Sequence, residues 1–363
     1  MTITPLLTAE YQIPGAAHIW TGSGAFDLNG PRPRVLAGDP EWLRLYELGN
    51  EAELLASYPR PSGRWQYTEH WIAPDLSYAV FMGEQSYQAV ARDGTRIWEQ
   101  GYGGWDAYRW GDVTLSADGS RIWLRLPSGV ANETLFLTLD ATGTVLARSI
   151  LPCGGYERHV QLGWTEGDEL VSVSVVGEKA THYEAVLVDD QVLLGDPLPL
   201  PRSGVPGLVD VSPSGEEGME VDDDRRHVRW HRLHPEHEVI AELSLKDFPK
   251  PGTGDCDVHN RPYLQFSGGY VDAGTALVHL YDDYDEARTL MVGDRWQQES
   301  HWLADPATRV VHGRIAYPGR EAENVKVLGD GTWLTTGWDT VQRWSAPTMP
   351  AHGLLKNPTR STA

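Results

Sequence analysis

Short antiparallel hairpins with similar turns recur along the whole chain. An alternating apolar strand, a short turn of Asp, Gly, Pro or Ser and a second strand occupy 71–80, 113–123, 162–171 and 208–215. Each copy is followed by a further hairpin, and two of these have Asp-Gly or Asp-x-x-Gly turns, at 93–94 and 140–143. Asp and Gly tolerate the backbone angles of tight turns, so the pattern predicts many antiparallel strands.

The spacing of these hairpins predicts the architecture. Four strands recur roughly every 40–55 residues, and self-similarity at that period is typical of a β-propeller. In that fold, four-stranded sheets bury their faces against their neighbours around a central axis. We therefore predict an all-β fold, consisting of a single β-propeller with four-stranded antiparallel blades.

The number of blades follows from where the innermost strands are expected to begin. These starts are Ala25, His70, Asp112, Val160, Leu208, Pro262 and His301. Seven blades are predicted, while six or eight stay open because Val325–Trp344 fits either the outer hairpin of the last blade or a separate inner one. The segment Ile3–Glu10 is expected to pair with the last blade and close the ring. The propeller is assigned to 1–345 and a flexible tail to 346–363.

Three of the repeated segments resemble those of a known family. The segments APDLSYAV, SADGSRIW and WTEGDELV, at 73–80, 116–123 and 164–171, resemble the inner-strand turn of WD-repeat and related bacterial β-propellers. The resemblance implies a fold, and a fold does not define a function. Propellers of this kind serve as interaction platforms, and others hold hydrolase, lyase or oxidoreductase sites in the central channel. The resemblance also implies a ligand site on the rim where successive blades are joined.

Composition excludes several classes of protein. The 363 residues have a formal net charge of −21, which would repel the phosphates of a nucleic acid. Two cysteines cannot form a disulfide framework. The N-terminus lacks the basic and apolar regions of a signal peptide, and no stretch approaches the ~20 apolar residues that cross a bilayer. We expect a cytoplasmic protein that binds neither nucleic acid nor membrane; its oligomeric state is open.

Aromatic and arginine residues gather in the segments predicted to join one blade to the next. These candidate ligand-binding residues are Arg64, Trp65, Tyr67, Trp105, Asp106, Tyr108, Arg109, Tyr156, Arg158, His259, Arg261 and Trp296. Aromatic rings offer flat contacts to proteins or planar ligands, and arginine binds carboxylate or phosphate through paired hydrogen bonds. The alternative is that these rings pack between blades.

Three histidines are candidates for chemistry in the channel. His70, His159 and His301 lie at or just before the expected inner strands, so they could act as bases or converge on a metal ion. The alternative is that His70 and His301 occupy core positions and are hydrogen-bonded between blades. No cofactor is expected, although a divalent metal on the channel axis is compatible with the histidines.

Other polar clusters are weaker candidates. Cys256 and His259 could form a thiolate and its base, but they also suit an exposed turn. His227 and His231 lie with His234 and His237 near three aspartates, which suggests a metal or pH-sensitive patch, or a solvated outer hairpin. On a strand, His227 and His231 would share one face with Arg229. No dinucleotide, P-loop or nucleophile-elbow motif occurs in the required context.

Two functions are therefore compatible with the sequence. The first is a soluble propeller that binds a protein, or an anionic or aromatic small molecule, at an aromatic- and Arg-lined channel mouth. The second is an intracellular lyase, hydrolase or isomerase with its site in the central channel, using histidine and acidic residues and a metal in one variant. Whether the protein is an enzyme is not decided by the sequence.

Overall fold

The computed structural model describes most of the strands but not all of the segments between them. The described residues are 1–14, 26–27, 32–61, 70–83, 86–102, 112–116, 119–127, 133–152, 171–175, 181–188, 191–194, 207–222, 225–232, 238–248, 263–282, 298–318, 322–337 and 339–347. Strands account for nearly all of their regular structure, and a 3-10 turn, η2 (Leu245–Asp247), follows one of them.

The strands of the described residues form seven sheets, numbered here in chain order. Sheet 1 contains β3 (Phe26–Asp27), β4 (Arg34–Gly38), β5 (Trp42–Leu48) and β6 (Ala52–Pro59). Sheet 2 contains β7 (His70–Ile72), β8 (Tyr78–Met82), β9 (Ser86–Ala91) and β10 (Arg96–Gly101). Sheet 3 contains β11 (Asp112–Leu115), β12 (Arg121–Pro127), β13 (Glu133–Asp140) and β14 (Val145–Pro152). Sheet 4 contains β15 (Val171–Val175), β16 (Thr181–Val188) and β17 (Gln191–Leu194).

The remaining three sheets include the two N-terminal strands. Sheet 5 contains β18 (Gly207–Val211), β19 (Glu217–Val221), β20 (His227–Arg232) and β21 (Glu238–Ser244). Sheet 6 contains β22 (Tyr263–Asp272), β23 (Thr275–Asp282), β24 (Gln298–Asp305), β25 (Val310–Ile315) and β1 (Thr2–Ile3). Sheet 7 contains β26 (Glu323–Val327), β27 (Thr332–Thr336), β28 (Thr340–Ser345) and β2 (Leu6–Gln12).

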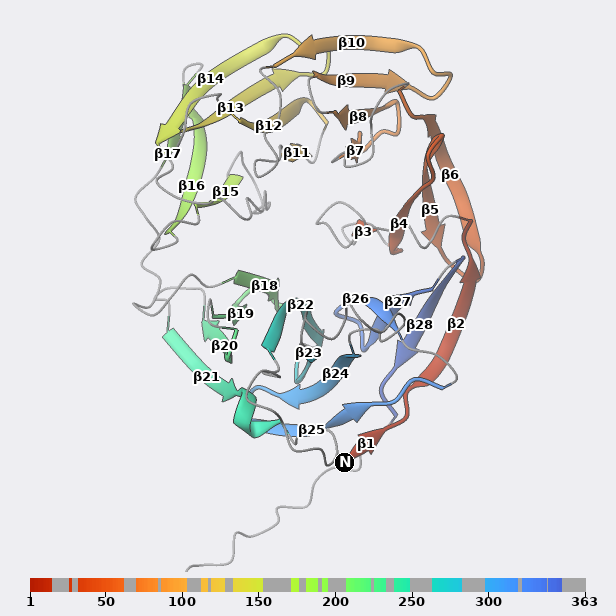
Figure 1. Cartoon of the computed structure of the whole chain (residues 1–363), viewed down its shortest axis with the longest axis vertical. Helices are drawn as coiled ribbons and strands as arrows, with labels where there is room; N and C mark the ends of the chain where they lie inside the picture. The colour runs from red at the N-terminus through yellow and green to blue at the C-terminus, as the bar shows by residue number, and fades with distance from the viewer. Residues whose placement is uncertain are drawn as a thin grey trace, which may run out of the picture.

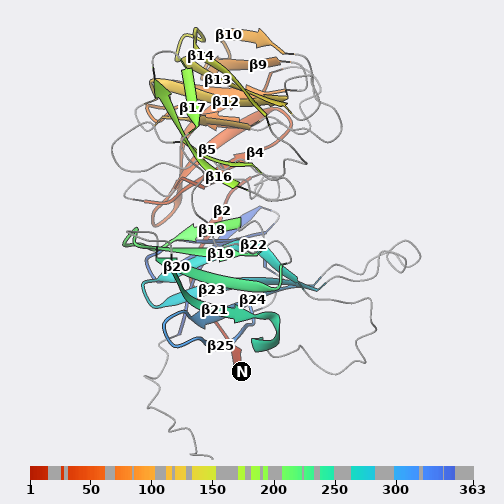
Figure 2. The same cartoon turned by 90° about the vertical axis from the view of Figure 1, so that its left-hand side faces the viewer.

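The sheets are arranged around a central axis (Figure 1). Within a sheet the strands follow one another in chain order, so that β7, β11, β18 and β22 lie near the axis and the later strands lie farther out. Figure 2 shows the ring from its side, with sheets 5 and 6 in the half that contains the N-terminus. Adjacent strands are antiparallel except for β1, which pairs in parallel with β25.

Burial explains why these segments form strands. The middle strand β8 is buried at all five positions, as expected for a strand packed between sheets on both faces. The tight turns place glycine where φ is positive, as at Gly94, where φ is +85°, and Gly143, where φ is +83°. The Asp93 and Asp140 side chains accept hydrogen bonds from turn N–H groups, which confirms the predicted hairpins.

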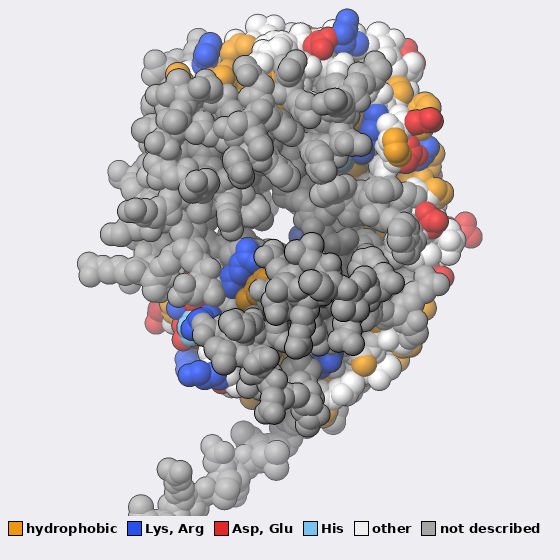
Figure 3. Space-filling model, in the orientation of Figure 1, with side chains coloured by type: hydrophobic (Ala, Val, Ile, Leu, Met, Phe, Trp, Pro, Cys, Tyr) orange, Lys and Arg blue, Asp and Glu red, His pale blue; other side chains and the backbone are white. Residues whose placement is uncertain are grey.

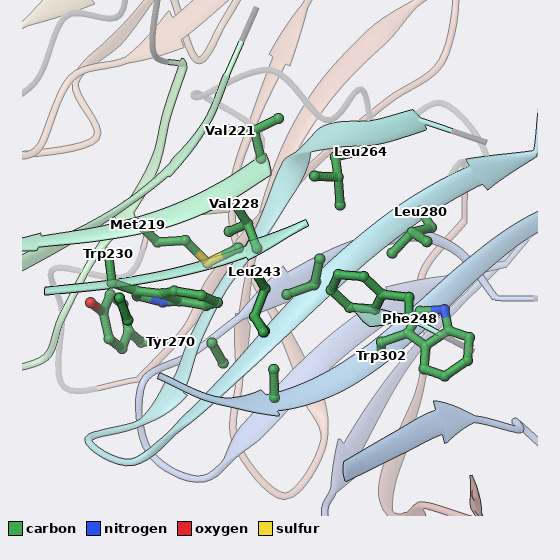
Figure 4. Packing of buried hydrophobic residues seen from close by; sticks show 14 residues of the cluster. Met219, Val221, Val228, Trp230, Leu243, Phe248, Leu264, Tyr270, Leu280 and Trp302 are labelled. Atoms are coloured by element: carbon green, nitrogen blue, oxygen red, sulfur yellow. The ribbon is translucent and has the colours of Figure 1, made fainter. Parts of the chain in front are cut away.

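Apolar clusters join six of the sheets in series. The cluster between sheets 5 and 6 includes Met219, Trp230, Tyr270 and Trp302, all no more than 3% exposed (Figure 4). Similar clusters join sheets 6 and 7, 7 and 1, 1 and 2, and 2 and 3. Sheets 6, 7, 1 and 2 therefore have an apolar cluster on both of their faces, and such burial is the main source of stability in packed sheets.

The N-terminal segment is shared between two sheets. Residues Leu6–Gln12 form the outer strand of sheet 7 through antiparallel pairing with β28, as expected for the N-terminal residues. Upstream, Ile3 is 3% exposed and packs in the cluster between sheets 6 and 7. The number of blades and the closure of the ring stay predictions, because parts of the chain between the sheets lie outside the described residues.

The expected start of the last inner strand was wrong. His301 does not begin an inner strand; it lies in β24, the third strand of sheet 6. The segment after it forms the turn from β24 to β25, in which the Asp305 side chain accepts a hydrogen bond from the Thr308 N–H at 3.1 Å. The inner strand of sheet 7 is β26, so the segment Val325–Trp344 supplies inner and middle strands, with β2 outside them. The expected start at Val160 and most of the proposed tail, 348–363, lie outside the described residues.

Candidate functional site

The order of strands places the segments that join successive sheets at one end of the ring. Each antiparallel sheet begins with its inner strand and ends with its outer strand, so the chain leaves one sheet and enters the next at the same end. We call this end the connection face. The strands of the four-stranded antiparallel series that end at this face are β6, β10, β14, β21 and β25.

The twelve candidate ligand-binding residues belong to segments that lie outside the described residues. Arg64, Trp65 and Tyr67 lie between β6 and β7, and Trp105, Asp106, Tyr108 and Arg109 lie between β10 and β11. Tyr156 and Arg158 follow β14, and His259 and Arg261 precede β22. Trp296 differs from the others because it lies between β23 and β24, within sheet 6. β23 and β24 are the second and third strands of sheet 6, and the second strand of an antiparallel sheet ends at the connection face.

A described arginine and tyrosine lie at the connection face and were not singled out by the sequence analysis. The guanidinium of Arg225 lies 5.1 Å from the ring centroid of Tyr263, at the start of inner strand β22. The backbone carbonyl of Arg225 accepts the Leu264 N–H at 2.9 Å, which ties this turn to the next sheet. In the view of Figure 3, Lys and Arg side chains lie beside the central opening, whereas Asp and Glu lie mainly at the periphery.

The candidate histidines occupy different environments. His70 begins inner strand β7, as predicted, and is half-buried. His301 is 2% exposed, and its Nδ1 lies 3.0 Å from the hydroxyl of Tyr317, which also accepts a hydrogen bond from Trp333 Nε1 at 3.0 Å. His301 is thus a core residue bonded across the contact between sheets 6 and 7, which is the second of the two roles that the sequence left open. His159 lies outside the described residues.

A second buried histidine lies beside His301. The ring centroids of His279 and His301 are 4.7 Å apart, and the rings are inclined by 68°. His279 is 5% exposed, and its Nδ1 lies 2.6 Å from Ser267 Oγ. Burial lowers the pKa of His279 to about 4. Burial, together with the neighbouring His279 and Arg314, also holds the pKa of His301 well below its ordinary value. Both rings are therefore neutral at pH 7.

Charged side chains share one face of sheet 5. The predicted alternation on β20 is confirmed, since Val228 and Trp230 face the apolar cluster while His227, Arg229 and His231 lie on the opposite face. β20 pairs with the outer strand β21, as expected for an outer hairpin, but the hairpin is not solvated at His231, which is 3% exposed.

Ion pairs connect this charged face. His231 Nε2 lies 2.6 Å from Glu220 Oε2, and both side chains are 4% exposed. Arg229 Nε lies 2.6 Å from Glu242 Oε2. Burial alone would raise the pKa of Asp222, but hydrogen bonds from the backbone and ring of His227 and from the Arg226 N–H lower it. These contacts neutralise buried charge, which would otherwise be costly.

Neither a metal centre nor a membrane helix is found in the described part of the chain. No group of three or more His, Cys, Asp or Glu side chains there could hold a metal ion. No helix among the described residues is long and apolar enough to cross a membrane. Cys256, His234 and His237 lie outside the described residues.

Comparisons with known proteins support the fold. No family model matches the chain, and no curated protein matches it. A solved β-propeller domain of Cps50 (Swd1) from Myceliophteria thermophila is similar, with a TM-score of 0.54 and 11% identity over 94% of this chain and 100% of that one. The WD40 propeller domain of Doa1 aligns over 95% of this chain and 98% of that one at 8% identity, but its TM-score of 0.47 carries no argument.

The comparison therefore identifies an architecture rather than an activity. The chain has a β-propeller fold, as predicted from the hairpin period and the resemblance of its turns. At 11% identity, what the similar domain binds cannot be carried over residue by residue.

Proposed function

We propose that this propeller binds a protein partner on its connection face. The observation that supports the proposal is the order of strands, because β6 and β10 end, and β7 and β11 begin, at the same end of the ring, and these strands flank the segments with Trp65, Trp105 and Arg109. Residues far apart in the sequence would then contribute to one contact surface. Tryptophan, tyrosine and arginine are the residues that contribute most to binding at protein interfaces.

The charge of the chain favours a partner with a basic surface. A net charge of −21 attracts a basic protein over a long range and speeds association at low salt. Arginines on the connection face would then pair with individual carboxylates at the centre of the contact. The net negative charge would thus raise the rate of association, and the aromatic and arginine side chains would make the contacts in the complex.

The enzymatic alternative has less support among the described residues. One of its candidate histidines, His301, is buried between sheets 6 and 7, whereas His70 lies at the start of inner strand β7. A protein-binding role requires no such group. If a small molecule bound at the same face, the proposed partner would change from a protein to a ligand, and the fold would be unaffected.

Site-specific crosslinking tests the proposal. A photoreactive phenylalanine analogue would replace Trp105 in one chain and Ile97 in a control, since Ile97 is 46% exposed on outer strand β10, away from the joining segment. Irradiation in the producing cells should give a discrete protein adduct at 105 and not at 97. The captured protein, once purified, should bind the unmodified chain and a variant with Arg92→Ala and Ile97→Ala equally.

The same binding measurement gives the refuting result. A variant with Trp105→Ala and Arg109→Ala should bind the captured protein at least 100-fold more weakly, on the order of the effect of two interface residues that dominate binding. Equal adducts at 105 and 97, or equal affinity of both double variants, would contradict a site on the connection face. If native mass spectra showed a retained small molecule and no protein adduct formed, the binding partner would be a small-molecule ligand and not a protein.

A further inference from the structure

Ser267 and His279 form a hydrogen bond at the inner edge of sheet 6. Ser267 lies in β22, the strand of this sheet nearest the axis, and its side chain is half-buried. Its Oγ is 2.6 Å from His279 Nδ1 on the adjacent strand β23. A hydroxyl within hydrogen-bond reach of a neutral imidazole is the arrangement that activates serine nucleophiles.

The backbone after Ser267 can be formed only by glycines. The register between β22 and β23 shifts between Leu264 and Gly268, and φ is +122° at Gly268 and +133° at Gly269. A Cβ on Gly268 would lie 2.3 Å from the Leu277 carbonyl oxygen. A Cβ on Gly269 would lie 2.2 Å from Asp210 Oδ2. Backbone of this kind costs free energy and is found at positions where a side chain is presented for function.

The strained segment is fixed from the neighbouring sheet. Asp210 Oδ2 accepts the Tyr270 N–H at 2.8 Å, which binds β22 to sheet 5 just after the two glycines. On the other side, the His301 ring packs against His279 with its centroid 4.7 Å away. Ser267 and His279 are therefore held in place by contacts from two directions, which is the preorganisation that a nucleophile and its base need.

The protonation state of His279 suits a proton acceptor. Because burial keeps the ring neutral at pH 7, one of its nitrogens bears a proton and the other accepts one. With the proton on Nε2, Nδ1 accepts the hydrogen bond from the Ser267 hydroxyl. Because the ring is only weakly basic, it favours esters whose leaving alcohol is itself weakly basic, such as aryl esters.

We propose that Ser267 is a nucleophile and His279 its general base in acyl transfer from activated esters. In the first half of the reaction, Ser267 Oγ bonds to the carbonyl carbon while its proton moves to His279 Nδ1. The bond from carbon to the leaving alcohol then breaks, and the alcohol departs with the proton from His279. Water repeats the sequence on the acyl-serine, which releases the acid and restores the hydroxyl. This activity requires no protein partner and is independent of the connection face.

A fluorophosphonate probe tests the nucleophile directly. The full chain at pH 7 should gain one phosphonyl group, which peptide mapping should locate at Ser267. Ser300→Ala is the matched control, since Ser300 is a 4% exposed serine of the same sheet that accepts a hydrogen bond from Trp302. It should label like the unchanged chain. Ser267→Ala should not label, and His279→Phe should label at least 100-fold more slowly, the lower range for loss of a general base.

Further measurements give the results that would overturn the proposal. The unchanged chain should release one 4-nitrophenol per chain as a burst from 4-nitrophenyl acetate, and Ser267→Ala should lack the burst. Ser267→Cys retains the size of the side chain and should be alkylated at 267 by iodoacetamide in the folded protein. Absence of phosphonylation in the unchanged chain, equal labelling of Ser267→Ala, or a thiol at 267 that stays unmodified would each refute the assignment.

Discussion

The two buried histidines should make the fold sensitive to mild acid. His279 and His301 are neutral in the folded chain because burial lowers both pKa values, that of His279 to about 4. Arg314 acts on His301, and the hydrogen-bond partners Ser267 of His279 and Tyr317 of His301 are neutral at pH 7. In the unfolded chain both histidines recover their ordinary value of 6.5. Acid therefore favours the unfolded state.

The size of the effect follows from proton linkage. Between pH 6.5 and about 4, the unfolded chain binds protons that the folded chain excludes, so stability falls as the pH falls. Each pH unit in this range costs about 1.4 kcal/mol per histidine. At pH 5 the loss is about 2 kcal/mol for His279, and the lowered pKa of His301 adds to it in the same direction. Below the folded pKa the loss no longer increases.

Urea unfolding at pH 7, 6 and 5 measures this loss, and two variants isolate its cause. His301→Phe fills a similar volume and removes one titrating group, so it should lose less stability than the unchanged chain between pH 7 and pH 5. Tyr317→Phe removes the hydrogen bond to His301 Nδ1 but retains the histidine, so it should be less stable at both pH values with an unchanged difference. If His301→Phe and the unchanged chain lose equal stability on acidification, the reasoning is wrong.

Three further predictions concern the framework, and urea unfolding at pH 7 measures each. Tyr11→Ala should lower the free energy of unfolding by about 3–5 kcal/mol, because Tyr11 is 2% exposed where β2 completes sheet 7, and an exposed Leu6→Ala control should change it by under about 1 kcal/mol. Gly269→Ala should cost about 2 kcal/mol or more through its clash with Asp210 and its positive φ; a variant of normal stability would contradict the constraint on β22. Glu220→Gln should cost about 3 kcal/mol, since it removes the buried carboxylate that lies 2.6 Å from His231, whereas Arg229 keeps its contact with Glu242; an unchanged midpoint would contradict the contribution of this pair to stability.

Local sequence patterns were sufficient for the architecture. The alternation of apolar residues and the Asp and Gly turns, such as Asp93-Gly94, identify hairpins because both signals act within a few residues of one another. The pairing of Leu6–Glu10 with the last sheet was also foreseen, whereas Ile3 pairs with β25 of the preceding sheet instead. The start of the last inner strand was missed, because the phrase around His301 resembles that around His70 although the two occupy different strands.

The proposed Ser267–His279 site was harder to predict because its contacts join residues on different strands. The bond from Ser267 to His279 spans 12 residues and depends on a register shift that the strand pattern does not reveal. Two consecutive glycines inside an alternating strand were the available signal, since glycine within a strand suggests a bulge. The buried pair of Glu220 and His231 gave no such signal, because charged residues on a strand ordinarily face water.

The sequence by itself determined the class of fold, the strand-rich character and the division of β20 into an apolar and a charged face, since period and turn chemistry are local properties. Only the tertiary structure decided which histidine lies in the core, that Asp210 holds the two glycines of β22, and that β1 and β2 belong to different sheets. Those features depend on how sheets pack against one another, and packing brings together residues whose separation along the chain leaves no periodic trace.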